Sequence, residues 1–165
     1  MSPAKIKMRQ LVDWRAAIWA GAISGVVFLV INMLLTKFYV GSPWVVIRLV
    51  ASIVMGTRVL PPPADFDATI FVFSLLVHFP LSIAFASIIA AILHRWGLLV
   101  GIIGGALFGL ALYVINFYTF TFFFPWFFPM RSWIMAVSHA IFGACAGGVY
   151  EGLEVEKFVP VEAEA

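Results

Sequence analysis

The sequence has very little charge for its length. Only 11% of its 165 residues are Asp, Glu, Lys or Arg, whereas 64% are hydrophobic, and the mean hydropathy is +1.08. Soluble domains carry about 25% charged residues, so this chain lacks the residues that would cover a water-facing surface. The composition excludes a soluble single-core enzyme, and 17 Phe and 6 Trp exclude a disordered chain.

The sequence has a single cysteine and none of the common catalytic motifs. The single Cys145 excludes a disulfide framework within the chain and any metal site built from several cysteines. The sequence contains no HExxH, no CxxC, no phosphate-binding glycine loop and no Gly-x-Ser-x-Gly. A net charge of +2 gives no footprint for nucleic acid. We therefore expect neither an enzyme nor a nucleic-acid partner.

What the sequence does have is four long apolar runs, each able to cross a bilayer core of about 30 Å as a helix. We expect spans at residues 16–38, 68–93, 98–124 and 132–150. The first run follows basic residues and could be read as a signal peptide. It is too long for that, and Lys37 rather than a small-residue cleavage site follows it. We expect a retained span.

The segment 44–58 is apolar but interrupted. Arg48, Ser52 and Gly56 recur every four residues, which makes one narrow polar stripe on a helix. The segment is too short and too charged to span, so it predicts an interfacial or re-entrant helix. Arg48 then needs a counter-charge from Asp65, Asp67 or a lipid phosphate, unless its side chain snorkels.

Four spans place both termini on one side of the membrane. Six basic residues flank the spans on that side and four on the other, which favours cytoplasmic termini. The predicted organisation is a basic N-terminus (1–15), one membrane domain (16–150) and an acidic tail (151–165), solvated and frayed or serving as a contact strip. The predicted fold class is an all-α four-transmembrane-helix bundle with one short interfacial helix on the outer side.

Small residues recur at four-residue spacing in three spans. Close packing of such residues drives helix association in lipid. Contact within the bundle is expected, and contact between chains is the alternative. The predicted packing residues are Gly21, Gly25, Gly101, Gly105, Gly109, Ala144 and Gly148, with Gly143 and Gly147 adjacent.

Four polar residues fall in the outer half of the spans, and they would form an intramembrane cluster if they faced one another: Asn32, His78, Asn116 and His139. The simplest interpretation is interhelical hydrogen bonding. Two sharper hypotheses remain open. His78 and His139 could be the two axial ligands of a b-type haem, or a proton or water path could run through His78, Asn116 and Tyr113.

Ten of the seventeen residues from Phe117 to Trp133 are aromatic. An aromatic belt at the outer interface explains this density, and a docking surface is the alternative. The residues expected to contact lipid or a partner are Arg48, Trp126, Phe127 and Phe128.

Several short motifs together resemble the YagU-like small bacterial inner-membrane proteins over roughly residues 16 to 150. They are Gly21/Gly25, Ser42-Pro43 with Arg48, His78, Trp96-Gly97 before the glycine-rich span, the Pro/Phe/Trp loop, and Ser138-His139-Ala140-Ile141-Phe142-Gly143. The chain lacks the longer polar insertions of YagU itself. The resemblance implies a bacterial inner-membrane location and no settled biochemical activity. Acid-stress survival is the role implied for YagU itself. A sodium:proline symporter label carried by some short relatives does not suit four spans without an inverted repeat.

The function expected from these features is that of a non-enzymatic accessory or structural subunit of a larger membrane assembly, such as a respiratory or photosynthetic complex. Its expected partners are membrane lipids and other membrane-protein subunits, with no cofactor of its own. A stand-alone transporter or proton-path protein built on His78 and His139 is the first alternative. A small cytochrome b is the second.

Overall fold

The computed structural model describes residues 7–160. Four helices are long and apolar enough to cross a membrane: α1 (Trp14–Val40), α3 (Ala68–Leu93), α4 (Gly97–Val114) with its continuation, and α5 (Trp133–Leu153). The continuation of α4 is a π turn (Ile115–Thr119) and a 3-10 turn (Phe120–Phe122), so this apolar helix reaches Phe122. The predicted all-α four-span bundle is confirmed, and the helices are those of a multi-pass membrane protein.

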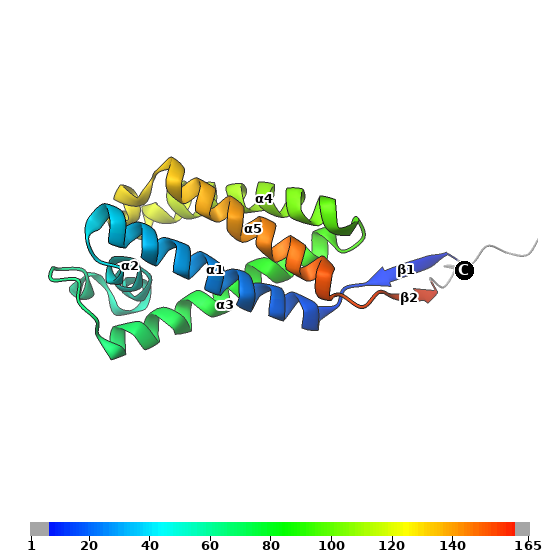
Figure 1. Ribbon diagram of the computed structural model, residues 1–165, viewed down its shortest axis with the longest axis horizontal. Coiled ribbons are helices and arrows are strands. Elements are labelled where there is room, and N and C mark those ends of the chain that lie inside the picture. Colours follow the sequence, from blue (N-terminus) through cyan, green and yellow to red (C-terminus); the bar gives the residue numbers. More distant parts are fainter. Residues whose placement is uncertain (1–6, 161–165) are drawn as a thin grey trace, which may run out of the picture.

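The helices lie along the long axis of the molecule (Figure 1). Helix α1 packs against α3 on one side and α5 on the other, and α4 packs along α5. Helix α2 (Trp44–Met55) lies at one end of the bundle. A two-stranded ribbon projects from the other end (Figure 1). We call these the α2 end and the ribbon end.

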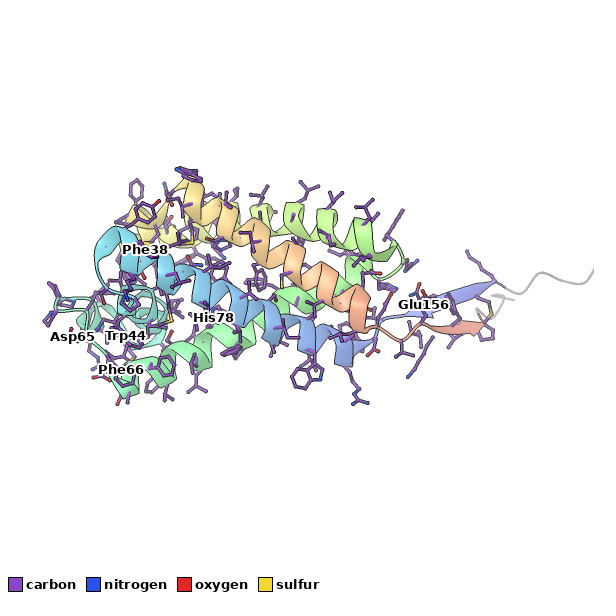
Figure 2. The ribbon with its side chains drawn as sticks, in the orientation of Figure 1. Phe38, Trp44, Asp65, Phe66, His78 and Glu156 are labelled. Carbon is purple, nitrogen blue, oxygen red and sulfur yellow. The ribbon has the colours of Figure 1, made fainter. Side chains whose placement is uncertain are left out.

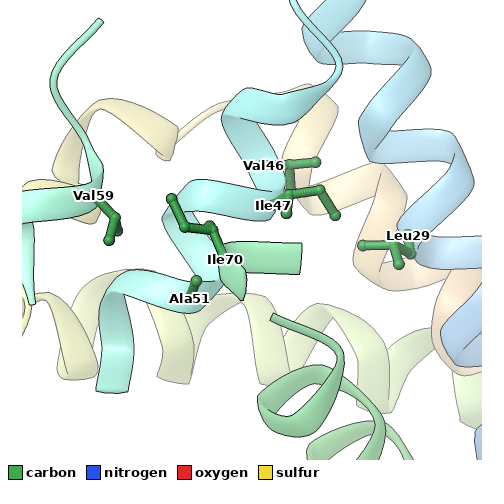
Figure 3. Packing of buried hydrophobic residues seen from close by; sticks show 6 residues of the cluster. All are labelled: Leu29, Val46, Ile47, Ala51, Val59 and Ile70. Carbon is green, nitrogen blue, oxygen red and sulfur yellow. The ribbon is translucent and has the colours of Figure 1, made fainter. Parts of the chain in front are cut away.

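Helix α2 is held against the bundle by an apolar cluster (Figure 3). The cluster draws on α1, α2, α3 and the 3-10 turn Thr57–Val59 and consists of Leu29, Val46, Ile47, Ala51, Val59 and Ile70. The helix is shorter than the expected 44–58, because Gly56 adopts a φ of +76° and donates its N–H back to Ser52. Only glycine takes this backbone conformation without strain.

The ribbon pairs β1 (Met8–Leu11) with β2 (Lys157–Pro160) in antiparallel register, with Met8 opposite Pro160 and Leu11 opposite Lys157. The expectation of a frayed tail is therefore wrong for residues 157–160. Residues 151–153 form the end of α5, and residues 154–156 link it to the ribbon. Residues 161–165 of the tail and residues 1–6 lie outside the described part of the chain. The ribbon forms because α1 begins and α5 ends side by side, which brings the two flanking segments together (Figure 1).

Asp13 joins these two segments at the base of the ribbon. Its Oδ1 caps α1 by accepting from the N–H groups of Arg15 (3.0 Å) and Ala16 (3.2 Å). Its Oδ2 accepts from the N–H of Val155 (3.2 Å), and its own N–H donates to the hydroxyl of buried Tyr150 (3.2 Å). The N–H of Ala16, above all, holds the pKa of Asp13 below its ordinary value.

Candidate functional site

Helices α4 and α5 meet backbone to backbone. A Cβ atom on Gly105 would overlap the carbonyl group of Gly143, and one on Gly109 would overlap that of His139. A Cβ on Gly101 would lie 3.2 Å from the carbonyl oxygen of Gly147. Glycines of α4 therefore lie directly against α5, as small-residue interfaces in membranes do.

The α5 side of this contact is not the row that the sequence analysis chose. It consists of His139, Gly143 and Gly147, which follow one another at four-residue spacing. Ala144 and Gly148 lie beside that row and are half-buried. Gly148 still faces α4, because a Cβ on it would lie 3.1 Å from the side chain of Ile102. From the sequence, Gly143 and Gly147 are named only as residues adjacent to the predicted packing row. Their Gly-x-x-x-Gly spacing nevertheless marks the part of α5 that lies closest to α4.

Gly21 and Gly25 of α1 lie against α3. A Cβ on Gly21 would come within 3.0 Å of the carbonyl oxygen of Ser82, and one on Gly25 would lie 2.9 Å from the Ser82 hydroxyl. The same Gly25 Cβ would lie 3.5 Å from Nε2 of His78. The close approach of α1 and α3 thus brings the backbone of Gly25 to His78.

A small cavity of about 100 Å³ lies between the four long helices. Four polar residues line it, namely His78, Ser82, Asn116 and His139, together with Phe28, Leu81, Phe85, Leu112 and Phe142. Figure 2 shows His78 about midway along the bundle. One water molecule needs about 10–15 Å³ of such space, so the cavity has room for several.

His78 is tied to α1. Its Nε2 lies 2.9 Å from the carbonyl oxygen of Gly25. A carbonyl only accepts hydrogen bonds, so this Nε2 carries a hydrogen atom and donates it. The Ser82 hydroxyl, one turn along α3, lies 3.4 Å from the same nitrogen. His78 therefore crosslinks α3 to α1 at the cavity wall.

His139 is held by its own helix and faces Asn116. Its Nδ1 lies 2.9 Å from the carbonyl oxygen of Met135 and must donate to it. In the neutral ring Nε2 is then the acceptor, and the Asn116 side-chain amide lies 3.4 Å away. Asn116 stands on the π turn that extends α4, and such turns recur at functional sites.

The structure brings three of the four predicted polar residues to this cavity and leaves out the fourth. Asn32 is 1% exposed, but its amide donates to the carbonyl of Phe28 in its own helix (2.9 Å) and does not line the cavity. Tyr113 contacts the ring of His139 and lies outside the lining as well. Sequence reasoning missed Phe28, whose ring contacts both imidazoles.

A haem ligated by His78 and His139 does not fit this geometry. His78 uses Nε2 to bond Gly25, and the Phe28 ring packs 4.9 Å from the His139 ring, centroid to centroid. The cavity of about 100 Å³ is far below the roughly 300–1,000 Å³ of ligand and cofactor pockets.

The aromatic segment, residues 117–133, forms a second candidate site at the α2 end. The side chain of Arg131 bonds other residues of the segment and so holds it together. The Arg131 guanidinium donates to the carbonyl of Phe117 and to the hydroxyl of Thr121, both at 2.6 Å. It also lies 4.5 Å from the ring centroid of Tyr118 and 4.2 Å from that of Phe128. A lone arginine inside an aromatic run was the sequence signal for this role, and it was missed.

The predicted contact residues divide into two kinds. Trp126 donates its indole N–H to Ser52 of α2 (2.8 Å), and Phe127 packs on Phe117, so both face inward. Phe128 is 60% exposed.

Arg48 is half-buried and bonds within the chain. It donates to the backbone carbonyls of Asp65 and Val59 at 3.0–3.2 Å, and so holds the loop before α3 against α2. Its partners are carbonyl groups, not the expected carboxylate.

Comparisons with protein-family models, curated proteins and solved structures give no match. The resemblance to the YagU-like family stays a prediction.

Proposed function

We propose that the chain is a structural subunit of a larger membrane assembly, without catalysis of its own. The observation that most supports this proposal is the aromatic segment 117–133 at the α2 end, which Arg131 holds in place. Phe122 and Phe123 are 85% and 65% exposed at the α2 end, while Arg131 and Trp126 fix the segment behind them. Exposed aromatic patches on a preorganised support are typical of protein–protein contact sites.

The interior of the bundle agrees with this proposal. The imidazoles of His78 and His139 each donate to a backbone carbonyl, and the amide of Asn32 does the same. Glycine contacts fix α4 against α5. Interior polar groups are thus bonded within the bundle, which leaves the outer surface as the part that meets neighbours.

The test is to replace Phe122 and Phe123 together by serine and to measure which proteins stay bound after gentle extraction from the native membrane. The proposal predicts that a stoichiometric partner is lost, because these rings are exposed. The bonds of Arg131 go to Phe117 and Thr121, which the substitutions leave in place. Trp19→Ser is the matched control, since Trp19 is 60% exposed but lies on α1 toward the ribbon end. Equal partner recovery from the double variant and from the wild type would contradict the proposal.

The proposed location is the bacterial inner membrane with the ribbon end in the cytoplasm. Basic residues support this orientation: Lys7, Arg9, Arg15, Arg95 and Lys157 lie at the ribbon end. A C-terminal fusion to green fluorescent protein should fluoresce, and a fusion to alkaline phosphatase should be inactive. The reverse pair of results would invert the orientation.

A second candidate function is a proton or water path, which one observation favours: His78, His139 and Asn116 border a single cavity. It predicts that His78→Ala and His139→Ala abolish proton flux in proteoliposomes. Unchanged flux in both variants would remove it.

A further inference from the structure

A basic hollow lies at the ribbon end, away from the cavity and the aromatic segment. Its volume is about 390 Å³, and three cationic residues, Lys7, Arg9 and Arg95, line it together with Met8, Gln10 and Phe158. The first two cations flank or belong to β1, and Arg95 comes from the turn between α3 and α4. No carboxylate lines the hollow among residues 7–160.

Arg95 is held in place by its neighbour. His94 is 4% exposed, and its Nδ1 lies 3.1 Å from the carbonyl of Ala91, to which it must donate. The other ring nitrogen is left to accept from Nε of Arg95 at 3.3 Å. Within residues 7–160, this bond through Nε is the side-chain hydrogen bond that Arg95 makes. Its terminal amino groups can therefore point to a ligand.

The start of α4 adds positive charge at the same turn. This helix begins at Gly97, two residues after Arg95, with no side-chain cap from Trp96 and no acidic residue in its first turn. The uncapped N–H groups of a helix start carry a partial positive charge that favours anions. The helix start follows Arg95 directly in the chain, although the hollow itself is lined by residues outside α4. Glu151 of α5 lies against Gly101, one turn further along α4.

The surroundings are those of a membrane surface. Trp14 and Trp96 are 57% and 65% exposed at this end, and Leu98 and Leu99 follow directly with 56% and 71% exposed. Exposed tryptophans mark the level of lipid headgroups. Cationic side chains next to an exposed apolar helix start are suited to bind a molecule that has an anionic headgroup and apolar chains.

We propose that this hollow binds the phosphate headgroup of an anionic phospholipid, whose acyl chains lie along the first turns of α4. Basic pockets at the cytoplasmic ends of transmembrane helices recognise such headgroups. This inference does not require a partner subunit.

The experiment is a titration of the full-length protein in neutral detergent with dioleoyl phosphatidylglycerol, followed by native mass spectrometry. Dioleoyl phosphatidylcholine is the comparison lipid. Replacing Arg9 and Arg95 together by glutamine should weaken phosphatidylglycerol binding about 30-fold, or ~2 kcal/mol for two cations. Binding of phosphatidylcholine should not change.

Two matched variants control for charge and for folding. Lys37→Gln with Arg58→Gln removes two exposed cations at the α2 end, and it should leave phosphatidylglycerol binding within threefold of the wild type. Arg9→Lys with Arg95→Lys keeps both charges and should do the same. Equal loss in the Lys37/Arg58 variant would overturn the proposal, and so would unchanged binding in the glutamine variant of Arg9 and Arg95.

A third measurement separates the lipid from free phosphate. Inorganic phosphate at millimolar concentration should not displace phosphatidylglycerol, because it lacks the apolar chains that reach Leu98 and Leu99. Displacement by phosphate would overturn the assignment to a lipid.

Discussion

Replacing Gly105 by alanine adds a methyl group where helix α5 leaves no room. The new Cβ would overlap the carbonyl group of Gly143. Because this obstacle is backbone and not the end of a flexible side chain, α4 and α5 must move apart to admit it.

The size of the effect follows from two opposing contributions. Overpacking costs about 1–3 kcal/mol, and replacing glycine by alanine inside a helix returns up to about 1 kcal/mol. The free energy of unfolding should therefore fall by about 1–2 kcal/mol, which lowers Tm by about 2–8 °C for a chain of this length.

Gly104 supplies the matched control on the same helix. The atoms nearest to a Cβ there are the methyl groups of Leu93, at 3.0 and 3.1 Å, and the end of this side chain is flexible. Gly104→Ala should leave Tm unchanged or raise it slightly.

The assay is thermal unfolding in detergent, followed by tryptophan fluorescence. If Gly105→Ala and Gly104→Ala have the same Tm, backbone contact between α4 and α5 does not stabilise the fold.

Three further predictions concern the two ends of the bundle. Asp13→Asn keeps an N-cap but removes the charge. Because the pKa of Asp13 in the folded state is lowered from 3.8, the wild type should lose more stability than this variant as the pH falls below about 4. The measurement is Tm against pH for both proteins. Parallel pH curves would contradict this. Trp126→Phe loses the bond to Ser52 and should cost ~1 kcal/mol, whereas an unchanged Tm would show that α2 docks without that bond. Arg131→Lys keeps the charge but loses the planar fork that bonds Phe117 and Thr121, so proteolysis between residues 117 and 133 should become faster; an unchanged rate would mean that Arg131 does not brace the segment.

The spans could be predicted from the sequence because bilayer thickness fixes the length of an uncharged helix. The expected span 68–93 coincides with α3, Ala68–Leu93. The ribbon could not be predicted in this way. Met8–Leu11 and Lys157–Pro160 are short and weakly patterned, and they pair only because the bundle brings the start of α1 to the end of α5.

The residue types of the candidate site could be predicted from the sequence, but the contacts of those residues could not. Depth in the membrane selected His78, Asn116 and His139, which line one cavity. The same criterion selected Asn32, which faces elsewhere because its amide bonds its own helix. Depth gives the level of a residue in a span, whereas the rotation of each helix decides what it meets.

Arg48 illustrates the same difficulty for charge. Charge pairing favoured Asp65, Asp67 or a lipid phosphate. Within the chain the guanidinium binds the backbone carbonyls of Asp65 and Val59 and neither carboxylate. The loop before α3 exposes backbone carbonyl groups, and no sequence pattern predicts which of them will point to an arginine.

The most direct test of the central proposal is native mass spectrometry of the unaltered protein, extracted gently from its own membrane. A structural subunit should give a stoichiometric mass that contains at least one other membrane protein. A monomer or homo-oligomer alone, with or without bound lipid, would contradict the proposal.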